Sequence, residues 1–268
     1  MTETPRSYRT GIGASDADTI KLLGQDLAAD LLGKVGFGEL AFRLVARRTP
    51  APEELTVFEA VLVALADHGF TPTAIAARLT YLSAPDSIQG ALAAGLLGGG
   101  SRFLGVTEDT AHFLHAAVEV LDEPPADDAG WDDVATGVVA ATRSEGRFVP
   151  GLGHPVHKVT DPRTTVLMQL ARDNGTFGPH LELFAAVGRV HPTVLGRTLP
   201  LNGAGVCGAV IADLDLPLGI ARGIALLARC AGLLGHLAEE MTDPIAMDVY
   251  TEVDRHTDYV PDGGAGVG

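Results

Sequence analysis

The sequence predicts an almost entirely α-helical protein, and three observations support this fold class. Ala, Leu and Gly dominate the 268 residues, whereas aromatic residues make up only 5%. Small aliphatic side chains suit closely packed helices better than a β-sandwich, which favours Val, Ile, Thr and aromatic residues. Apolar residues recur at helical spacing in segments that end at Pro or Gly, and no segment alternates with the period of a strand.

The first half of the chain contains six segments with helical spacing. Apolar residues share one face of a predicted helix over 16–32, which Ser15 or Asp16 would cap. A helix that starts near Pro52 is expected to end at His68, with Gly69 in the position after its end. Asp86 is expected to cap the fifth helix. The six predicted helices span 16–32, 37–47, 52–68, 74–82, 87–97 and 107–121.

The second half predicts helices over 131–143, 162–174, 179–190 and 217–239, and 194–199 is a possible continuation of the third. The last helix is apolar enough to be taken for a membrane span. However, Arg222, Arg229 and His236 lie seven residues apart and so fall nearly on one face. A helix that faces lipid would not carry such a row, so we expect a core helix beside a polar site.

Charge and cysteine content restrict the function classes. The formal net charge of −15 disfavours nucleic acid and anionic membrane surfaces as partners, so an anion site must be a local cluster of Arg, Lys or helix N-termini. Cys207 and Cys230 lie in apolar stretches and are interpreted as buried thiols. The N-terminal sequence lacks an apolar signal core, and we expect a cytoplasmic protein.

Two histidine segments are candidates for acid–base chemistry. His68 lies at the C-terminal end of its helix, where the helix dipole favours an imidazolium, and it is either catalytic or a capping residue. The segment 151–158, Gly-Leu-Gly-His-Pro-Val-His-Lys, combines glycines that let the backbone approach a ligand with histidines that can donate or take a proton. It is a ligand loop, an exposed polar loop or, through His154 and His157, a metal site with an incomplete set of ligands.

Arginines in two helices are candidates for binding a carboxylate. Arg163 stands at a helix start, where a cation is unfavourable unless it faces an anion. Arg229 has almost no polar sequence neighbours, so it either forms a salt bridge in the core or meets a substrate carboxylate. Arg255, taken alone, is interpreted as part of a surface pair with His256.

Five blocks of sequence, taken together, carry a resemblance to a known family. They are Ala66 to Gly69, Gly95 to Phe103, Gly151 to Arg163, Leu227 to His236 and Tyr250 to Pro261. In this order and spacing they resemble the citrate synthase superfamily, and within it citryl-CoA lyase and the lyase module of ATP citrate lyase. The resemblance covers the chain from about Leu40 to Pro261.

The resemblance implies an all-α homodimer with two domains in each subunit. The large domain would comprise 1–106 and 204–268, and the small domain, 107–203, would close over the ligands. His68 and His154 would contact the carboxylate-bearing half of the substrate. Arg163 and Arg229 would bind carboxylates, and Arg255 would add a third contact.

Coenzyme A is implied as part of a thioester substrate and product. The backbone at Val149, Gly151, Leu152 and Gly153 would cradle its adenine end, and Asn202 is retained from the family's Asn-Val-Asp segment. No metal, nucleic acid or membrane is expected.

The sequence also departs from the family pattern. Phe103 stands where the synthases have a histidine that polarises the thioester, as in the lyase module, which favours cleavage over synthesis. Ala204 replaces the catalytic aspartate, and Asp213 and Asp215 follow too late to fill its place. Pro155 replaces the arginine after the loop histidine, and His157 is our first choice for the missing acid–base group.

The expected activity is therefore a carbon–carbon lyase that cleaves citryl-CoA, or a related 3-hydroxy-3-carboxyacyl-CoA, to acetyl-CoA or another acyl-CoA and a 2-oxo acid such as oxaloacetate. Two alternatives stay open. The chain could be a non-catalytic relative that binds CoA or a metabolite, which Ala204 favours. It could also carry out condensation or thioester hydrolysis in the same cleft.

Overall fold

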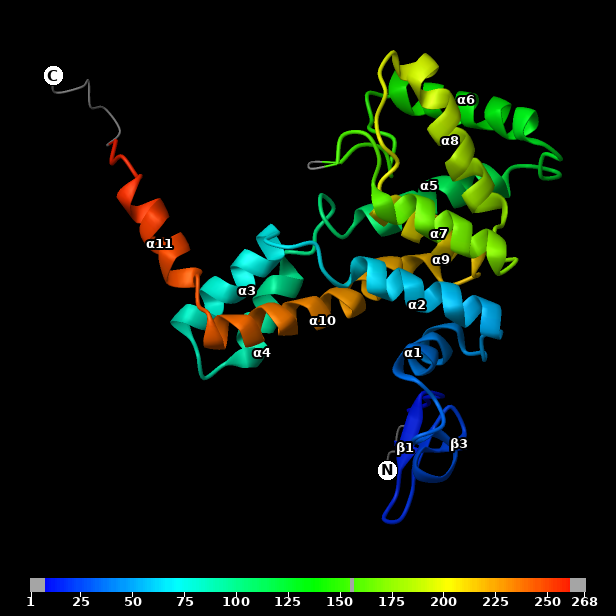
Figure 1. Cartoon of the computed structure of the whole chain (residues 1–268). Helices are drawn as coiled ribbons and strands as arrows, with labels where there is room; N and C mark the ends of the chain where they lie inside the picture. Colours follow the sequence, from blue (N-terminus) through cyan, green and yellow to red (C-terminus); the bar gives the residue numbers. More distant parts are fainter. Residues whose placement is uncertain (1–7, 155–156, 261–268) are drawn as a thin grey trace, which may run out of the picture. The chain divides into compact units, whose positions relative to one another are not determined.

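The computed structural model describes residues 8–154 and 157–260, which form two compact units (Figure 1). Unit 1 joins the described residues up to Ala64 with Val106–Ile224, and unit 2 joins Leu65–Gly105 with the described residues from Ala225 onward. The division into 107–203 and the remainder, expected from the resemblance, stays a prediction. Pro155 lies outside the described residues.

The N-terminal segment is a small sheet, so the helix predicted over 16–32 is wrong. Three strands, β1 (Gly13–Ser15), β2 (Ile20–Leu22) and β3 (Gln25–Asp26), pair antiparallel in this order, and a π-helical turn follows over Leu27–Leu31. The Asp16 carboxylate closes the first reversal by accepting hydrogen bonds from the N–H groups of Asp18 and Thr19, at 3.0 and 2.7 Å. Gly24, at φ 81°, permits the second reversal.

Helices make up the rest of unit 1, which confirms the predicted fold class (Figure 1). Helix α6 packs against α8, and helices α5, α7 and α8 pack against α9. The predicted helices of this unit agree with the observed ones to within a few residues, with two exceptions. Helix α8 continues beyond the predicted end at residue 190, but only to Leu195, and α9 was not predicted. The helices are α1 (Phe37–Ala46), α2 (Pro52–Ala66, of which residues to Ala64 belong here), α5 (Val106–Glu119), α6 (Asp128–Ser144), α7 (Pro162–Asp173), α8 (Pro179–Leu195) and α9 (Gly203–Asp213), followed by a short 3-10 helix, Leu218–Ile220.

Helix α9 lies in the core of unit 1, where nearly all its residues are buried. Two glycines allow its neighbours to approach. A Cβ at Gly208 would lie 2.3 Å from the Thr107 carbonyl oxygen of α5, and one at Gly205 would lie 2.6 Å from the Cα of Gly151. These contacts are shorter than any side chain tolerates, so glycine at both positions fixes how α5 and the loop at Gly151 pack on α9.

Unit 2 is built from α3 (Pro72–Ser83), α4 (Ile88–Leu97), most of α10 (Ala221–Thr242) and α11 (Ala246–Arg255). Helix α3 packs against α4 and α11. Ser87, not the predicted Asp86, takes the cap position of α4. Gly69 adopts φ 72°, but α2 ends at Ala66, so Gly69 does not directly follow the helix end as predicted. The core of this unit is formed by Ala74, Ala77, Ala91, Leu233 and Leu237.

The segment Leu218–Thr242, which contains α10, is long and apolar enough to cross a membrane by length and composition. Its mean hydropathy is 1.5, and 33% of the most apolar window is buried. The row of Arg222, Arg229 and His236 on this helix forms ion pairs or hydrogen bonds with other side chains of the same unit. Arg222 pairs with Glu108, and His236 pairs with Asp67. The absence of a membrane partner stays a prediction.

Candidate functional site

The predicted ligand loop of unit 1 is fastened to the segment that leads into α9. The Gly153 N–H donates to the Pro200 carbonyl at 2.8 Å, and the Asn202 N–H donates to the Gly151 carbonyl at 2.9 Å. The Asn202 side chain donates to the Gly153 carbonyl at 2.8 Å and accepts from the Gly205 N–H, which caps α9. Gly151 and Gly153 have φ of 81° and 86°, so the course of this loop favours glycine at both positions.

A buried carboxylate, Asp161, organises the end of this loop. Its Oδ1 and Oδ2 accept from Nε and Nη2 of Arg163, at 3.0 and 2.7 Å, and Oδ2 also accepts from the Gly203 N–H at 2.7 Å. Burial alone would raise the pKa of Asp161, but the bonds and charge of Arg163, together with the Gly203 N–H, lower it to about 2. Asp161 is therefore ionised at neutral pH and is a poor proton acceptor.

Arg163 lies at the start of α7 with part of its donor capacity in use. A guanidinium has five N–H donors. Two contact Asp161, and a third, on Nη1, contacts the Ala64 carbonyl at 3.2 Å. A Cβ at Gly203 would lie 2.3 Å from Nε of Arg163, so glycine is required beside the guanidinium. An oriented arginine with remaining donors can hold a carboxylate in a fork geometry.

The two loop histidines lie together. Their ring centroids are 4.5 Å apart, and the backbone N–H of His157 donates to Nδ1 of His154 at 2.9 Å. Because Nδ1 accepts this bond, a neutral His154 carries its proton on Nε2. That atom lies 4.0 Å from Oδ2 of Asp161. His154 is thus arranged to present an N–H donor, and His157 supplies a second imidazole beside it.

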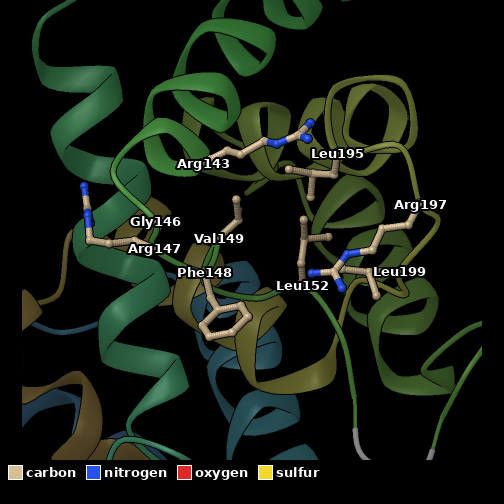
Figure 2. Close-up of a pocket in the computed structure, with 9 residues that line it drawn as sticks. All are labelled: Arg143, Gly146, Arg147, Phe148, Val149, Leu152, Leu195, Arg197 and Leu199. Atoms are coloured by element: carbon tan, nitrogen blue, oxygen red, sulfur yellow. The ribbon is translucent and has the colours of Figure 1, made fainter.

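A cavity of about 420 Å³ opens in unit 1 beside the same loop (Figure 2). In Figure 2 the side chains of Val149 and Leu152 lie in the middle of the view, with Arg143, Arg147 and Arg197 around them. All three arginines are exposed, and Phe148 is 86% exposed beside them. The lining is completed by Gly146, Phe148, Leu195 and Leu199. Arg147 also pairs with Glu145, so Arg143 and Arg197 supply the net positive charge that an anionic ligand needs in a chain of net charge −15.

In unit 2 the predicted carboxylate binder Arg229 is 4% exposed and lies beside Asp67, with 3.3 Å between Nη1 and Oδ1. The salt-bridge interpretation of Arg229 is thus observed, and its role toward a substrate stays a prediction. Asp67 also accepts from Nε2 of His236 at 2.9 Å and from the Gly69 N–H at 2.7 Å. Burial raises the pKa of Asp67, but these bonds outweigh it, and the net pKa lies below its ordinary value.

A second buried arginine extends this network. Arg78, 1% exposed, donates from Nε to Nδ1 of His236 at 3.2 Å and from Nη1 to Oε2 of Glu240 at 2.8 Å, and it also pairs with Glu239. Since Arg78 can only donate, Nδ1 of His236 accepts and Nε2 holds the proton that faces Asp67. These contacts form a continuous network from Glu240 through Arg78, His236 and Asp67 to Arg229. The network holds the charged side chains next to the Asp67-His68 segment in place.

The remaining predicted residues are placed as follows. His68 is half-buried just beyond the end of α2, and Arg255 is exposed at the end of α11. Phe103 is 42% exposed. His154, His157, Arg163 and Asn202 belong to unit 1, whereas His68, Arg229 and Arg255 belong to unit 2. That the two groups act on one substrate stays a prediction.

Ala204, which stands where the family pattern predicts the acid–base aspartate, is half-buried in the first turn of α9. Asp213 lies at the other end of this helix, where it accepts from the N–H groups of Gly178, His180 and Leu181. Asp215 is exposed. Cys207 is fully buried and burial raises its pKa to about 12, which excludes a thiolate nucleophile; Cys230 is half-buried rather than buried.

Sequence reasoning missed Asp161 and Arg78 as organising residues. Asp161 carried a usable signal, because Asp directly before Pro at a helix start is typical of a cap, and its side chain does accept from the Arg163 N–H. Arg78 lies in an Ala-rich helix whose sequence neighbours do not reveal its partners, since Glu240 and His236 are about 160 residues away.

A family model for the citrate synthase C-terminal domain matches residues 19–247. The chain belongs to the citrate synthase family. Among solved structures of this family, citryl-CoA lyase from Hydrogenobacter thermophilus is 26% identical, with a TM-score of 0.83 over 98% of both chains. ATP citrate lyase from Methanothrix soehngenii, solved with citrate and coenzyme A, shares the fold at 23% identity and a TM-score of 0.76, over 98% of this chain and 43% of that one.

Curated relatives in the family are longer than this chain. A probable ATP-citrate synthase of Caenorhabditis elegans is 23% identical over 88% of this chain, but the match spans only 22% of the relative. The relatives are enzymes of the citrate synthase and lyase class. The likeness to citryl-CoA lyase covers both chains almost completely, unlike the likeness to the ATP-dependent enzymes.

Proposed function

We propose that this chain is a carbon–carbon lyase that cleaves citryl-CoA, or a related 3-hydroxy-3-carboxyacyl-CoA, into an acyl-CoA and a 2-oxo acid such as oxaloacetate. The observation that carries the proposal is the likeness to citryl-CoA lyase at a TM-score of 0.83 over 98% of both chains. The complex of a related ATP citrate lyase from Methanosaeta concilii with (3S)-citryl-CoA supports the same substrate class.

The cavity beside Val149 and Leu152 supports coenzyme A as the carrier of the acyl group. Coenzyme A has an aromatic base and several phosphate groups. Phe148 offers a face for stacking, and the three arginines offer cations for phosphates. Of the backbone predicted to cradle the adenine end, Val149 and Leu152 line this cavity, whereas Gly151 and Gly153 belong to the same loop, which Asn202 holds in place.

The proposed reaction breaks the bond between the hydroxyl-bearing carbon and the thioester α-carbon. The hydroxyl proton passes to a base near His154, for which His157 is the candidate, and the oxygen becomes the keto oxygen of the product. Nε2–H of His154 donates to that oxygen as its double bond forms. The bonding electrons move into the thioester enolate, which takes up a proton at its α-carbon to give the acyl-CoA.

The arginines would hold the 2-oxo acid while the bond breaks. Arg163 is oriented by Asp161 and retains donors for a carboxylate. Arg229 and His68 are assigned to the carboxylate-bearing half by the family resemblance, and Arg255 to a third contact. Coenzyme A enters as part of the substrate and leaves as part of the product.

The test is turnover of citryl-CoA by the purified chain, followed as oxaloacetate through a coupled dehydrogenase. His154→Ala should reduce kcat by about 10²–10⁴-fold, the range for a lost acid–base or donor group, and His157→Ala should do the same if it is the base. His256→Ala, an exposed histidine on α11, is the matched control and should keep wild-type turnover.

A non-catalytic CoA binder is the second candidate, and Ala204 is the observation that favours it. Calorimetric titration with coenzyme A separates the two. If the wild-type chain binds coenzyme A but does not turn over citryl-CoA, the protein is a CoA binder and the lyase proposal is wrong. Turnover that is lost in His154→Ala supports the lyase.

A further inference from the structure

A cluster that the proposed reaction does not use lies among α5, α8 and α9 of unit 1. His180 follows the start of α8, Asp213 ends α9, and His115 lies on α5. Nδ1 of His180 is 2.8 Å from Oδ1 of Asp213, and Nε2 of His180 is 3.3 Å from Nδ1 of His115. Two imidazole nitrogens on different helices therefore face each other.

The carboxylate of Asp213 fixes which nitrogen of His180 carries a proton. An ionised carboxylate only accepts, so Nδ1 of His180 is the donor, and Nε2 of the neutral ring has a lone pair directed at His115. Asp213 is itself held rigidly, because it also accepts from three N–H groups at the start of α8. His180 is 8% exposed, so its ring has little freedom to turn.

The spacing of the facing nitrogens suits a transition metal. With Zn–N bonds of about 2.0–2.1 Å, two nitrogen ligands of a tetrahedral zinc are about 3.3–3.4 Å apart. The observed separation is 3.3 Å. The ring centroids are 5.5 Å apart and the ring planes are inclined by 21°, so the nitrogens occupy the near edges of the two rings.

Each imidazole also has a carboxylate behind it. Nδ1 of His180 contacts Asp213, and Nε2 of His115 lies 3.9 Å from Oε2 of Glu119, one helical turn further along α5. A carboxylate on the far nitrogen orients a metal-binding imidazole and strengthens it as a ligand. The side chain of His115 is 46% exposed, which gives an ion and its water ligands access.

We propose that His180 Nε2 and His115 Nδ1 bind a divalent transition metal ion of the zinc class, with water in the other positions. Imidazole pairs select such ions over magnesium and calcium, which prefer oxygen ligands. When the metal binds, His115 changes tautomer. Its ring stays neutral, but its proton is then on Nε2, next to Glu119, which leaves Nδ1 with a lone pair for the metal. This site is independent of the proposed function.

The test is calorimetric titration of chelator-treated, untagged protein with zinc chloride. One zinc should bind per chain, and His115→Ala should lower the affinity at least tenfold. His112→Ala removes an exposed histidine one turn earlier on α5 and should leave the affinity unchanged. Glu119→Gln should weaken binding about 10-fold or more, the usual cost of losing an outer carboxylate.

Thermal unfolding gives a second readout on the same variants. Zinc should raise the Tm of the wild-type chain and of His112→Ala, and leave that of His115→Ala unchanged. The proposal is overturned if the wild-type chain binds no zinc, or if His115→Ala binds it as tightly as wild type. His115 is partly exposed, so this variant is expected to fold.

Discussion

Asp161 concentrates several roles in one buried carboxylate. It orients Arg163, caps α7 and accepts from the first N–H of α9. Replacing it by Asn would leave the guanidinium without its counter-charge in a site that is mostly closed to water. We therefore expect Asp161→Asn to lower the free energy of unfolding by about 2–4 kcal/mol, somewhat less than for a fully buried pair because the Arg163 side chain is 21% exposed, measured by urea unfolding.

The pKa of Asp161 also predicts acid sensitivity. A carboxylate whose folded-state pKa is lowered from 3.8 to about 2 stabilises the fold above pH 4. Its contribution, about 2 kcal/mol, is lost as the pH falls from 4 toward 2. Unfolding curves at pH 6, 4 and 2.5 should show this loss in the wild-type chain and a smaller one in Asp161→Asn. Equal acid sensitivity in both proteins would contradict the assignment.

Ala204 offers a gain-of-function test. It lies at the second position of α9, where the helix dipole favours an anion, so Ala204→Asp should fold with a stability within about 1 kcal/mol of wild type. If the family's acid–base carboxylate is what this chain lacks, kcat for citryl-CoA should rise at least 10-fold, within the 10²–10⁴ range of such groups. A folded variant with unchanged or lower kcat would argue that another group already does this work.

At the scale of elements, glycine sets how close helices come. A Cβ at Gly232 of α10 would lie 2.0 Å from the Ala66 carbonyl at the end of α2, whereas one at Gly235, on the same helix, meets nothing within 4 Å. Gly232→Ala should therefore lower the free energy of unfolding by more than about 2 kcal/mol. Gly235→Ala should raise it by up to about 1 kcal/mol, since Ala is the better helix former.

The same pair tests the network at Asp67. Gly232 holds α10 close to the Asp67 segment, with Asp67 Cβ only 3.2 Å from the added atom. If both variants had wild-type unfolding curves in urea, the close crossing of α10 over the end of α2 would be wrong.

Most helices could be predicted because local signals were unopposed. In α7, Pro162 at the helix start, apolar spacing and Asn174 at the end all agree with the final structure. In α8 the predicted start at Pro179 is correct, but the helix runs past its predicted end at Val190, through Pro192, to Leu195. The segment 16–32 misled because its Ile and Leu residues happen to recur at helical spacing. There the side chain of Asp16 and the φ of Gly24 close two turns instead.

Helix α9 could not be predicted from its own sequence. Gly203, Gly205 and Gly208 give it a low helix propensity, and its stability comes from burial against α5, α7 and α8. At the site, residue type and family pattern pointed to His154 and Arg163. Asp161 lies only two residues from Arg163, but the Gly203 N–H that also contacts it lies 42 residues away, and periodicity does not encode that contact.

For the whole molecule, charge and apolar surface set the expected partners. The negative field disfavours polyanions in general, and the cavity with Arg143, Arg147 and Arg197 is a place where an anion could still bind. The homodimer implied by the family resemblance stays a prediction.

Helix α11 provides a test of that dimer. It exposes Met247, Tyr250 and Val253 at 52%, 56% and 64%, and exposed apolar side chains that lie together can mark an interface. Light scattering after size exclusion should give twice the chain mass for the wild-type protein and for the control Glu252→Gln. Val253→Glu should shift the protein toward the monomer. A monomeric wild-type chain would contradict the dimer.

Cleavage of citryl-CoA can be followed by NMR analysis of the products formed in deuterated water. We expect oxaloacetate and acetyl-CoA in equal amounts, with one deuterium in the acetyl methyl group, because the enolate takes its proton from solvent-exchangeable donors. Citrate and free coenzyme A, the products of thioester hydrolysis, or citryl-CoA left intact by folded protein, would contradict it.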